Sequence, residues 1–250
     1  MTISEFSDEF DVYAASQSET AAASEGLLFF DEYEKSVHLT KALNDFVKEL
    51  YTGDTGNLSF EKTEELRRSL DALVLNCEIG QRDIENSNKG FEKAWNTSQL
   101  DLQAAFASNA KKDIWFITLE MCDIKDADGN TIYDVPVIPV TQDELHRTLK
   151  NPFRGVSTRR VLRMDLGNNK VQLLTPKTKD GKRYDVVKYR FRCLRKPNPI
   201  ILVSLPDNLK IDGQKDKSGC ELNSVTHRTI LEIAVKMAIA SRIQGQQQTK

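Results

Sequence analysis

The sequence predicts an α+β fold, in which an N-terminal helical bundle precedes an antiparallel β-rich part with a buried C-terminal helix. Three patterns predict it. Apolar residues recur every three or four positions near the N-terminus, β-branched and aromatic residues alternate with polar ones from about residue 112, and a broad apolar helical band returns at 224–243. With 250 residues, 39% of them hydrophobic, the chain is long enough to bury such a core.

The N-terminal arm, residues 1–26, begins with a short amphipathic helix. Ile3, Phe6, Phe10 and Tyr13 fall on one helical face, and the small polar residues that follow indicate a tether. An arm of this composition either docks on a neighbouring molecule or folds back on its own chain, and the sequence favours neither.

An acidic helical part is predicted over 27–110. Residues 30–51 carry the clearest helical pattern, and residues 61–76 carry another with leucines on its inner face. The stretch 80–110 is polar and weakly patterned, but its spaced aromatic and leucine residues indicate a broken helix. We therefore expect a small bundle over this region.

A basic β-rich part is predicted over 111–245, because its segments alternate and are separated by turn sequences. Two hairpins are expected, one from 114–124 with 131–140 and one from 159–166 with 170–174. Such hairpins make neighbouring strands antiparallel.

The end of the β-rich part contains one more strand, 184–194, and the helix at 224–243. That helix is apolar around more than half of its circumference, so we expect it to be buried against the sheet or against another subunit. Residues 246–250 are expected to form a disordered tail.

The strand at 184–194 has two chemically different faces. Val187, Tyr189, Phe191 and Cys193 share one face, and successive strand residues point to opposite sides. The basic residues on the other face therefore point away from the aromatic rings, which argues against stacking of nucleic-acid bases on Tyr189 or Phe191. Pro197 and Pro199 then end the strand, because proline cannot donate a ladder hydrogen bond.

Charge is distributed very unevenly along the chain. The formal net charge is only −2, yet residues 1–100 carry 20 acidic and 9 basic residues, whereas residues 147–196 carry 16 basic and 3 acidic ones. This asymmetry indicates either that the basic segment contacts a polyanion or that the acidic part of one copy packs against the basic part of the next.

Motifs for catalysis or metal binding are not visible. The four cysteines are widely scattered without CxxC spacing, the three histidines show no metal-binding spacing, and GxSxG, Walker A and GxGxxG motifs are missing. The sequence therefore predicts a non-enzymatic protein without metal or cofactor. It also predicts no signal peptide and no membrane partner, since no apolar run approaches the roughly 20 residues that a membrane helix requires.

The candidate partner-binding residues come from the basic segment. They are exposed cations in the expected strands and the residues that follow them, and their partner is either an acidic protein surface of another subunit or the nucleic-acid backbone. They are Arg159, Arg163, Lys188, Arg190, Arg192, Arg195 and Lys196.

Several segments, in this order along the chain, resemble a family of virion structural proteins from crAss-like and related podovirus-like tailed phages. They are "EYEKSVHLTKALNDFVKELY", "LKNPFRGVSTRRVLRMDL", "RFRCLRKPNPIILVSLP" and "CELNSVTHRTILEIAVKMA". The resemblance covers most of the chain, and residues 80–140 are its least similar part.

The resemblance implies a ring in the head–tail connector or tail barrel, below the portal, through which DNA passes. It implies a self-assembled ring of twelve copies, contacts with the portal and adjacent tail proteins, and a place in the virion after assembly in the host cytoplasm. Tight phosphate binding in the bore would slow DNA ejection, so we expect the basic residues to face an acidic neighbour or to lie outside the bore. The alternative function is a nucleic-acid-binding accessory protein that uses the basic β face.

Overall fold

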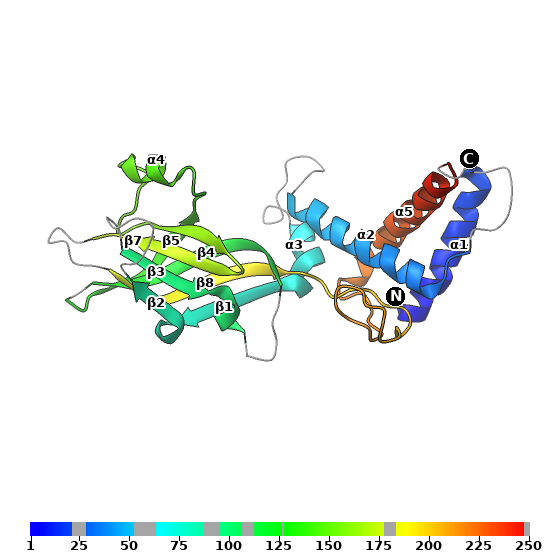
Figure 1. Cartoon of the computed structure of the whole chain (residues 1–250), viewed down its shortest axis with the longest axis horizontal. Coiled ribbons are helices and arrows are strands. Elements are labelled where there is room, and N and C mark those ends of the chain that lie inside the picture. The colour runs from blue at the N-terminus through cyan, green and yellow to red at the C-terminus, as the bar shows by residue number, and fades with distance from the viewer. Residues whose placement is uncertain are drawn as a thin grey trace. The chain divides into compact units, whose positions relative to one another are not determined.

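The computed structural model describes residues 1–21, 29–52, 64–87, 96–106, 113–126, 128–177 and 184–247. The chain forms two compact units, one from residues 1–73 with 196–250 and one from residues 74–195 (Figure 1). We call these the helical unit and the β unit. The division expected from the sequence, with boundaries at residues 27, 111 and 246, stays a prediction.

The helical unit contains α1 (Ile3–Ala21), α2 (Glu32–Thr52), α3 (Glu64–Leu70) and α5 (His227–Gln247), with short 3-10 turns η1 (Asp71–Leu73) and η4 (Ser224–Thr226). Helix α5 packs against α1 and α2 of its own unit, whereas its apolar band had predicted burial against the sheet or another subunit. Phe6 and Phe10 of the apolar stripe of α1 are fully buried in this bundle, and Ile3 and Tyr13 are half-buried. The N-terminal arm therefore folds back on its own chain.

Two helix boundaries differ from expectation. Helix α1 continues through the start of the predicted tether to Ala21, because alanines and glutamate there sustain helical structure. Helix α5 likewise includes Gln246 and Gln247 of the predicted tail. Residues 22–26 of the tether and 248–250 of the tail lie outside the described residues. Within the described part of the chain, no helix is both long and apolar enough to cross a membrane.

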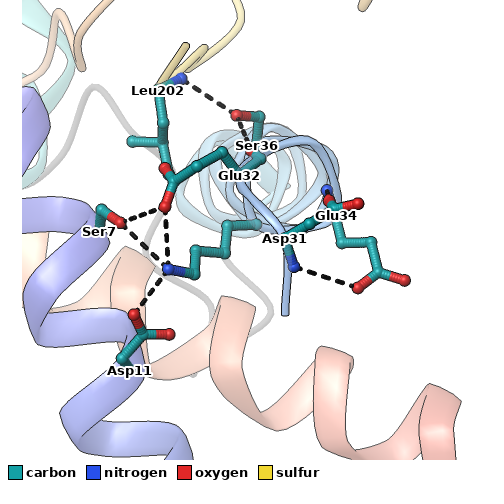
Figure 2. Close-up of polar contacts among 8 residues, drawn as sticks. Ser7, Asp11, Asp31, Glu32, Glu34, Ser36 and Leu202 are labelled. Carbon is teal, nitrogen blue, oxygen red and sulfur yellow. Dashed lines mark hydrogen bonds and ion pairs between the residues drawn. The ribbon is translucent and has the colours of Figure 1, made fainter. Parts of the chain in front are cut away.

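A buried ammonium group joins α1 to α2. The Lys35 side chain is only 3% exposed, and its Nζ lies 2.7 Å from Asp11 Oδ2 and 3.0 Å from Glu32 Oε1. Ser7, Asp11 and Glu32 converge on this one group (Figure 2). Burial alone lowers the pKa of Lys35, but the hydrogen bonds that its ammonium donates to Asp11 and Glu32, together with their negative charge, outweigh burial and raise the pKa.

The proline-containing segment after residue 196 packs on α2. Thr40 Oγ1 accepts a hydrogen bond from Ile200 N at 3.1 Å and donates one to Ile200 O at 3.2 Å. Ser36 Oγ accepts a bond from Leu202 N at 3.0 Å (Figure 2). Side chains of α2 thus satisfy backbone groups that would otherwise be buried without partners, because this segment has no neighbouring strand at these positions.

The β unit is an eight-stranded mixed sheet in the order β1-β8-β4-β5-β6-β7-β3-β2 (Figure 1). Only the β5–β6 pair is parallel, and the other neighbours are antiparallel. Strands β2 and β3 also contact β8, so the sheet curls until it is nearly closed. The strands are β1 (Val74–Gly80), β2 (Ile84–Ser87), β3 (Asn96–Asp101), β4 (Ile114–Lys125), β5 (Thr131–Pro139), β6 (Val161–Gly167), β7 (Lys170–Thr175) and β8 (Asp185–Arg195).

Both expected hairpins and the expected last strand are present as β4–β5, β6–β7 and β8. The tight β6–β7 turn uses Gly167, Asn168 and Asn169, all at positive φ, a conformation that glycine and asparagine adopt most readily. The helical expectation for residues 74–101 was wrong in the described parts, since β1, β2 and β3 form there. Residues 88–95 of the expected broken helix lie outside the described residues.

The curled sheet has a buried inner face and a partly covered outer face. Tyr189, Phe191 and Cys193 of β8 lie in the inner core, as their alternation predicted. On the outer face, helix α4 (Leu145–Lys150) packs on β6 and β7 through a small cluster. The members of that cluster are Val140, Leu145, Leu149, Val156, Leu162, Met164 and Leu174.

Candidate interaction surface on the β sheet

The structure brings three of the predicted basic residues together on the outer face of β8. Lys188, Arg190 and Arg192 occupy alternate positions of this strand, and their side chains point away from the inner core. Register places Asn76 of β1 and Leu119 of β4 opposite Arg192, and Glu78 and Met121 opposite Arg190. Strands β1, β8 and β4 therefore form one continuous surface.

Acidic residues from the flanking strands pair with two of these cations. Lys188 Nζ lies 2.8 Å from Glu78 Oε1 on β1. Arg190 bridges Asp123 on β4 and Asp134 on β5, the latter at 2.8 Å. Because these carboxylates belong to the same sheet, they offset the positive charge of Lys188 and Arg190 and weaken the attraction of this face for a DNA phosphate.

Arg190 also supports an irregular part of the sheet. Asp134 has a positive φ of 55°, and its backbone N–H donates to Asp123 Oδ1 at 3.0 Å. The β4–β5 register shifts at this point. Arg190 thus joins the two aspartates that fix the bulge, so its first role is structural.

A shallow hollow of about 320 Å³ lies on this face. Leu119 and Met121 supply its apolar part, and Leu119 is 51% exposed. Glu78, Arg190 and Arg192 also line it. An apolar floor with charged groups around it is the usual composition of a protein–protein contact. We call this feature the β8 hollow.

The other predicted residues lie elsewhere. Arg159 is exposed in the segment between α4 and β6, and Arg195 is half-buried at the end of β8. Lys196 belongs to the helical unit, where its Nζ lies 2.8 Å from Asp212 Oδ2. The sequence therefore predicted a larger set of residues than this one surface contains.

Arg163 does not belong to the surface, which corrects the expectation that it is an exposed cation. It is 8% exposed and points inward from β6, with its Nε 3.2 Å from Glu120 Oε2. Tyr189 donates a hydrogen bond to the same carboxylate oxygen at 2.7 Å. Burial raises the pKa of Glu120, while Arg163 and Tyr189 oppose that rise. The strand pattern alone did not reveal which face of β6 is inside.

Metal and thiol chemistry finds little support in the described residues. Among them, no three His, Cys, Asp or Glu side chains gather in a way that could hold a metal ion. The four cysteines are free thiols, and burial raises the pKa of Cys122 to about 12 and that of Cys220 to about 11. Thiols with such values are poor nucleophiles at neutral pH.

Comparison with known proteins gives the class of this protein, which is a structural ring component of a phage virion. Ring protein 3 of Bacteroides phage crAss001 is 39% identical over 251 residues, which covers 98% of this chain and 97% of that protein. Ring protein 4/5 of the same phage is 26% identical over 247 residues, which covers 96% and 93%. The family model described as "Phage tail ring protein 3/4" matches residues 1–250, and the chain belongs to this family.

Proposed function

We propose that copies of this chain close into a ring in the head–tail connector or tail barrel, below the portal, and that phage DNA passes through that ring. The observation that carries the proposal is the similarity of nearly the whole chain to two differently numbered ring proteins of one phage. Related proteins in differently numbered rings of one particle are what we would expect if the rings were stacked around a common axis. The resemblance in the sequence implies twelve copies per ring.

The proposed contact between copies uses the β8 hollow. Its apolar floor, formed by Leu119 and Met121, can be desolvated by a neighbouring copy. Arg192 lines the hollow beside Leu119, so it is the cation that we assign to the contact with a neighbour. Arg190 is a poor choice for a charge-reversal test, because a glutamate there would face Asp123 and Asp134 and would destabilise the sheet.

Electron microscopy of the purified full-length chain, alone and with the portal of its phage, tests the proposal. The expected result is a ring for the wild type, and a loss of rings for Arg192→Glu. Arg82→Glu is the matched control, because Arg82 is an exposed arginine of the β unit that does not line the β8 hollow. Thermal melting of each variant separates failure to assemble from failure to fold. Wild-type protein that forms no ring in either condition contradicts the proposal.

A further inference from the structure

A basic segment of the β unit displays an exposed aromatic ring. Residues 145–160 contain five basic residues and no acidic one. Phe153 is 87% exposed within this segment, and Lys150, Arg154 and Arg159 are exposed as well. No acidic side chain that the structure describes pairs with these three cations. We call residues 145–160 the basic turn.

The backbone of the basic turn is held by its own hydrogen bonds. Phe153 N–H donates to Asn151 Oδ1 at 2.9 Å, and the Phe153 carbonyl accepts a bond from Arg160 Nη1 at 2.7 Å. Gly155 N donates to Asn151 O at 2.8 Å, and a Cβ at Gly155 would lie only 3.0 Å from that oxygen. A partner therefore meets a preorganised backbone, which reduces the entropy lost on binding.

Helix α1 of the helical unit presents the opposite chemistry. It contains five acidic residues and no basic one. Glu5, Asp8 and Val12 follow one another at steps of three and four residues, so they share the helix face opposite buried Phe6 and Phe10. Glu5 and Asp8 are exposed, and Val12 is 68% exposed. No cationic side chain that the structure describes pairs with these two carboxylates. We call Glu5, Asp8 and Val12 the acidic face of α1.

These two surfaces are complementary in charge and in apolar content. Cations flank Phe153 in the basic turn, and carboxylates accompany Val12 on α1. The β8 hollow, by contrast, is lined by Arg190 and Arg192, so it would repel the basic turn. A DNA backbone would attract the cations but offers no apolar group to Phe153. Two unlike surfaces of one molecule join copies head to tail, and such contacts close into a ring when the rotation permits.

We propose that the basic turn of one copy docks on the acidic face of α1 in the next copy, with Phe153 against Val12 and Arg154 beside Asp8. The inference rests on the proposed ring, and it adds a second contact between copies, apart from the β8 hollow. The uneven charge along the chain supports a second copy as the partner, because each copy carries both an acidic and a basic surface.

Charge reversal on each surface tests the contact. In the full-length chain, Arg154→Glu and Asp8→Lys should each reduce ring formation about tenfold at equal concentration, because like charges then meet at the contact. Arg82→Glu and Glu49→Lys are the matched controls, since both residues are exposed and lie outside the two surfaces. All four variants should keep the wild-type melting temperature, because the replaced side chains are exposed.

A mixture of the two variants shows whether the contact joins different copies. Arg154→Glu chains can alternate with Asp8→Lys chains around a ring, because every contact then pairs an acidic with a basic side chain. Electron microscopy should therefore show that an equimolar mixture recovers the rings that each variant alone has lost. Mixing would restore nothing if the contact lay within one chain.

Two results would overturn the inference but leave the proposed ring intact. One is rings that form as well with Arg154→Glu as with the wild type, even where that variant binds duplex DNA less tightly. The other is a mixture that stays without rings when each variant alone has lost them. Wild-type protein that forms no ring, alone or with the portal, overturns both the inference and the proposed function.

Discussion

Lys35 illustrates how much of this fold depends on the surroundings of single residues. Its ammonium group is nearly inaccessible to solvent, yet Asp11 and Glu32, which bind it, are about half exposed. The sequence offered one signal for this site, the spacing of Glu32 and Lys35 on one helix. Nothing in the sequence placed Asp11 beside them, because that contact depends on how α1 packs on α2.

Replacement of Lys35 by methionine should lower the free energy of unfolding by about 1–2 kcal/mol, because charge-assisted hydrogen bonds are lost while the packing of the stem is kept. Urea unfolding followed by circular dichroism measures this change. Lys41→Met is the control, since Lys41 is exposed on the same helix. An equal effect of both variants would contradict the assigned role of Lys35.

Tyr189→Phe should lower the free energy of unfolding by a similar amount, about 1–2 kcal/mol, because Glu120 loses its hydrogen-bond donor in a buried site. The same denaturation experiment applies, with Tyr133→Phe as the exposed control. A neutral result at Tyr189 would mean that Arg163 alone satisfies Glu120.

At the scale of elements, the long and strongly alternating segments were predictable and the short polar ones were not. Strands β4, β5, β6, β7 and β8 follow from alternation and turn residues. Strand β3 contains Asn96, Thr97, Ser98 and Gln99, so it carries almost no apolar signal, and its pairing with β7 makes it a strand. In the candidate surface, alternation predicted the outward cations of β8, but it could not predict their acidic partners on β1, β4 and β5.

Thr40→Val should destabilise the contact between α2 and the segment around Ile200. Both backbone groups of Ile200 lose their partner in a buried environment, so we expect a loss of about 2 kcal/mol in the free energy of unfolding. Thr52→Val is the matched control, because the Thr52 hydroxyl is exposed and binds a carbonyl of its own helix at 2.9 Å. Comparable losses at the two positions would refute the argument.

At the scale of the whole molecule, the two units differ in how their residues are distributed along the sequence. The β unit is one continuous stretch, whereas the helical unit is assembled from both ends of the chain. Local patterns identified α1, α2 and α5 separately, but patterns of this range carry no information on which helices meet. The C-terminal helix was therefore expected to be buried against the sheet or another subunit, whereas within its unit it packs on the N-terminal helices.

The helical unit should lose stability in mild acid. Burial lowers the pKa of His38 and of His227, so the unfolded chain takes up protons before the folded one. The stability that these residues provide is complete above the ordinary histidine value of about 6.5 and declines as the pH falls below it. Melting followed by helical circular dichroism between pH 7.5 and 5.5 measures the decline.

His227→Gln should flatten this dependence on pH, since it removes one of the two histidines whose pKa is lowered by burial. His146→Gln is the control, because His146 is exposed on α4 in the β unit. A melting temperature that stays constant across this range in the wild type would disprove the assignment.

The order in which the ribosome makes the chain has a consequence for the helical unit. Helices α1 and α2 are synthesised first, but α5 is synthesised only after the whole β unit. Thr40 and its hydrogen-bond partner Ile200 are likewise separated by 160 positions in the sequence. Contacts between residues so far apart in the sequence form slowly, and apolar helix faces that stay exposed until then promote aggregation. A nascent chain that stops before residue 227 would thus carry a finished sheet and helices whose main partner has not been synthesised.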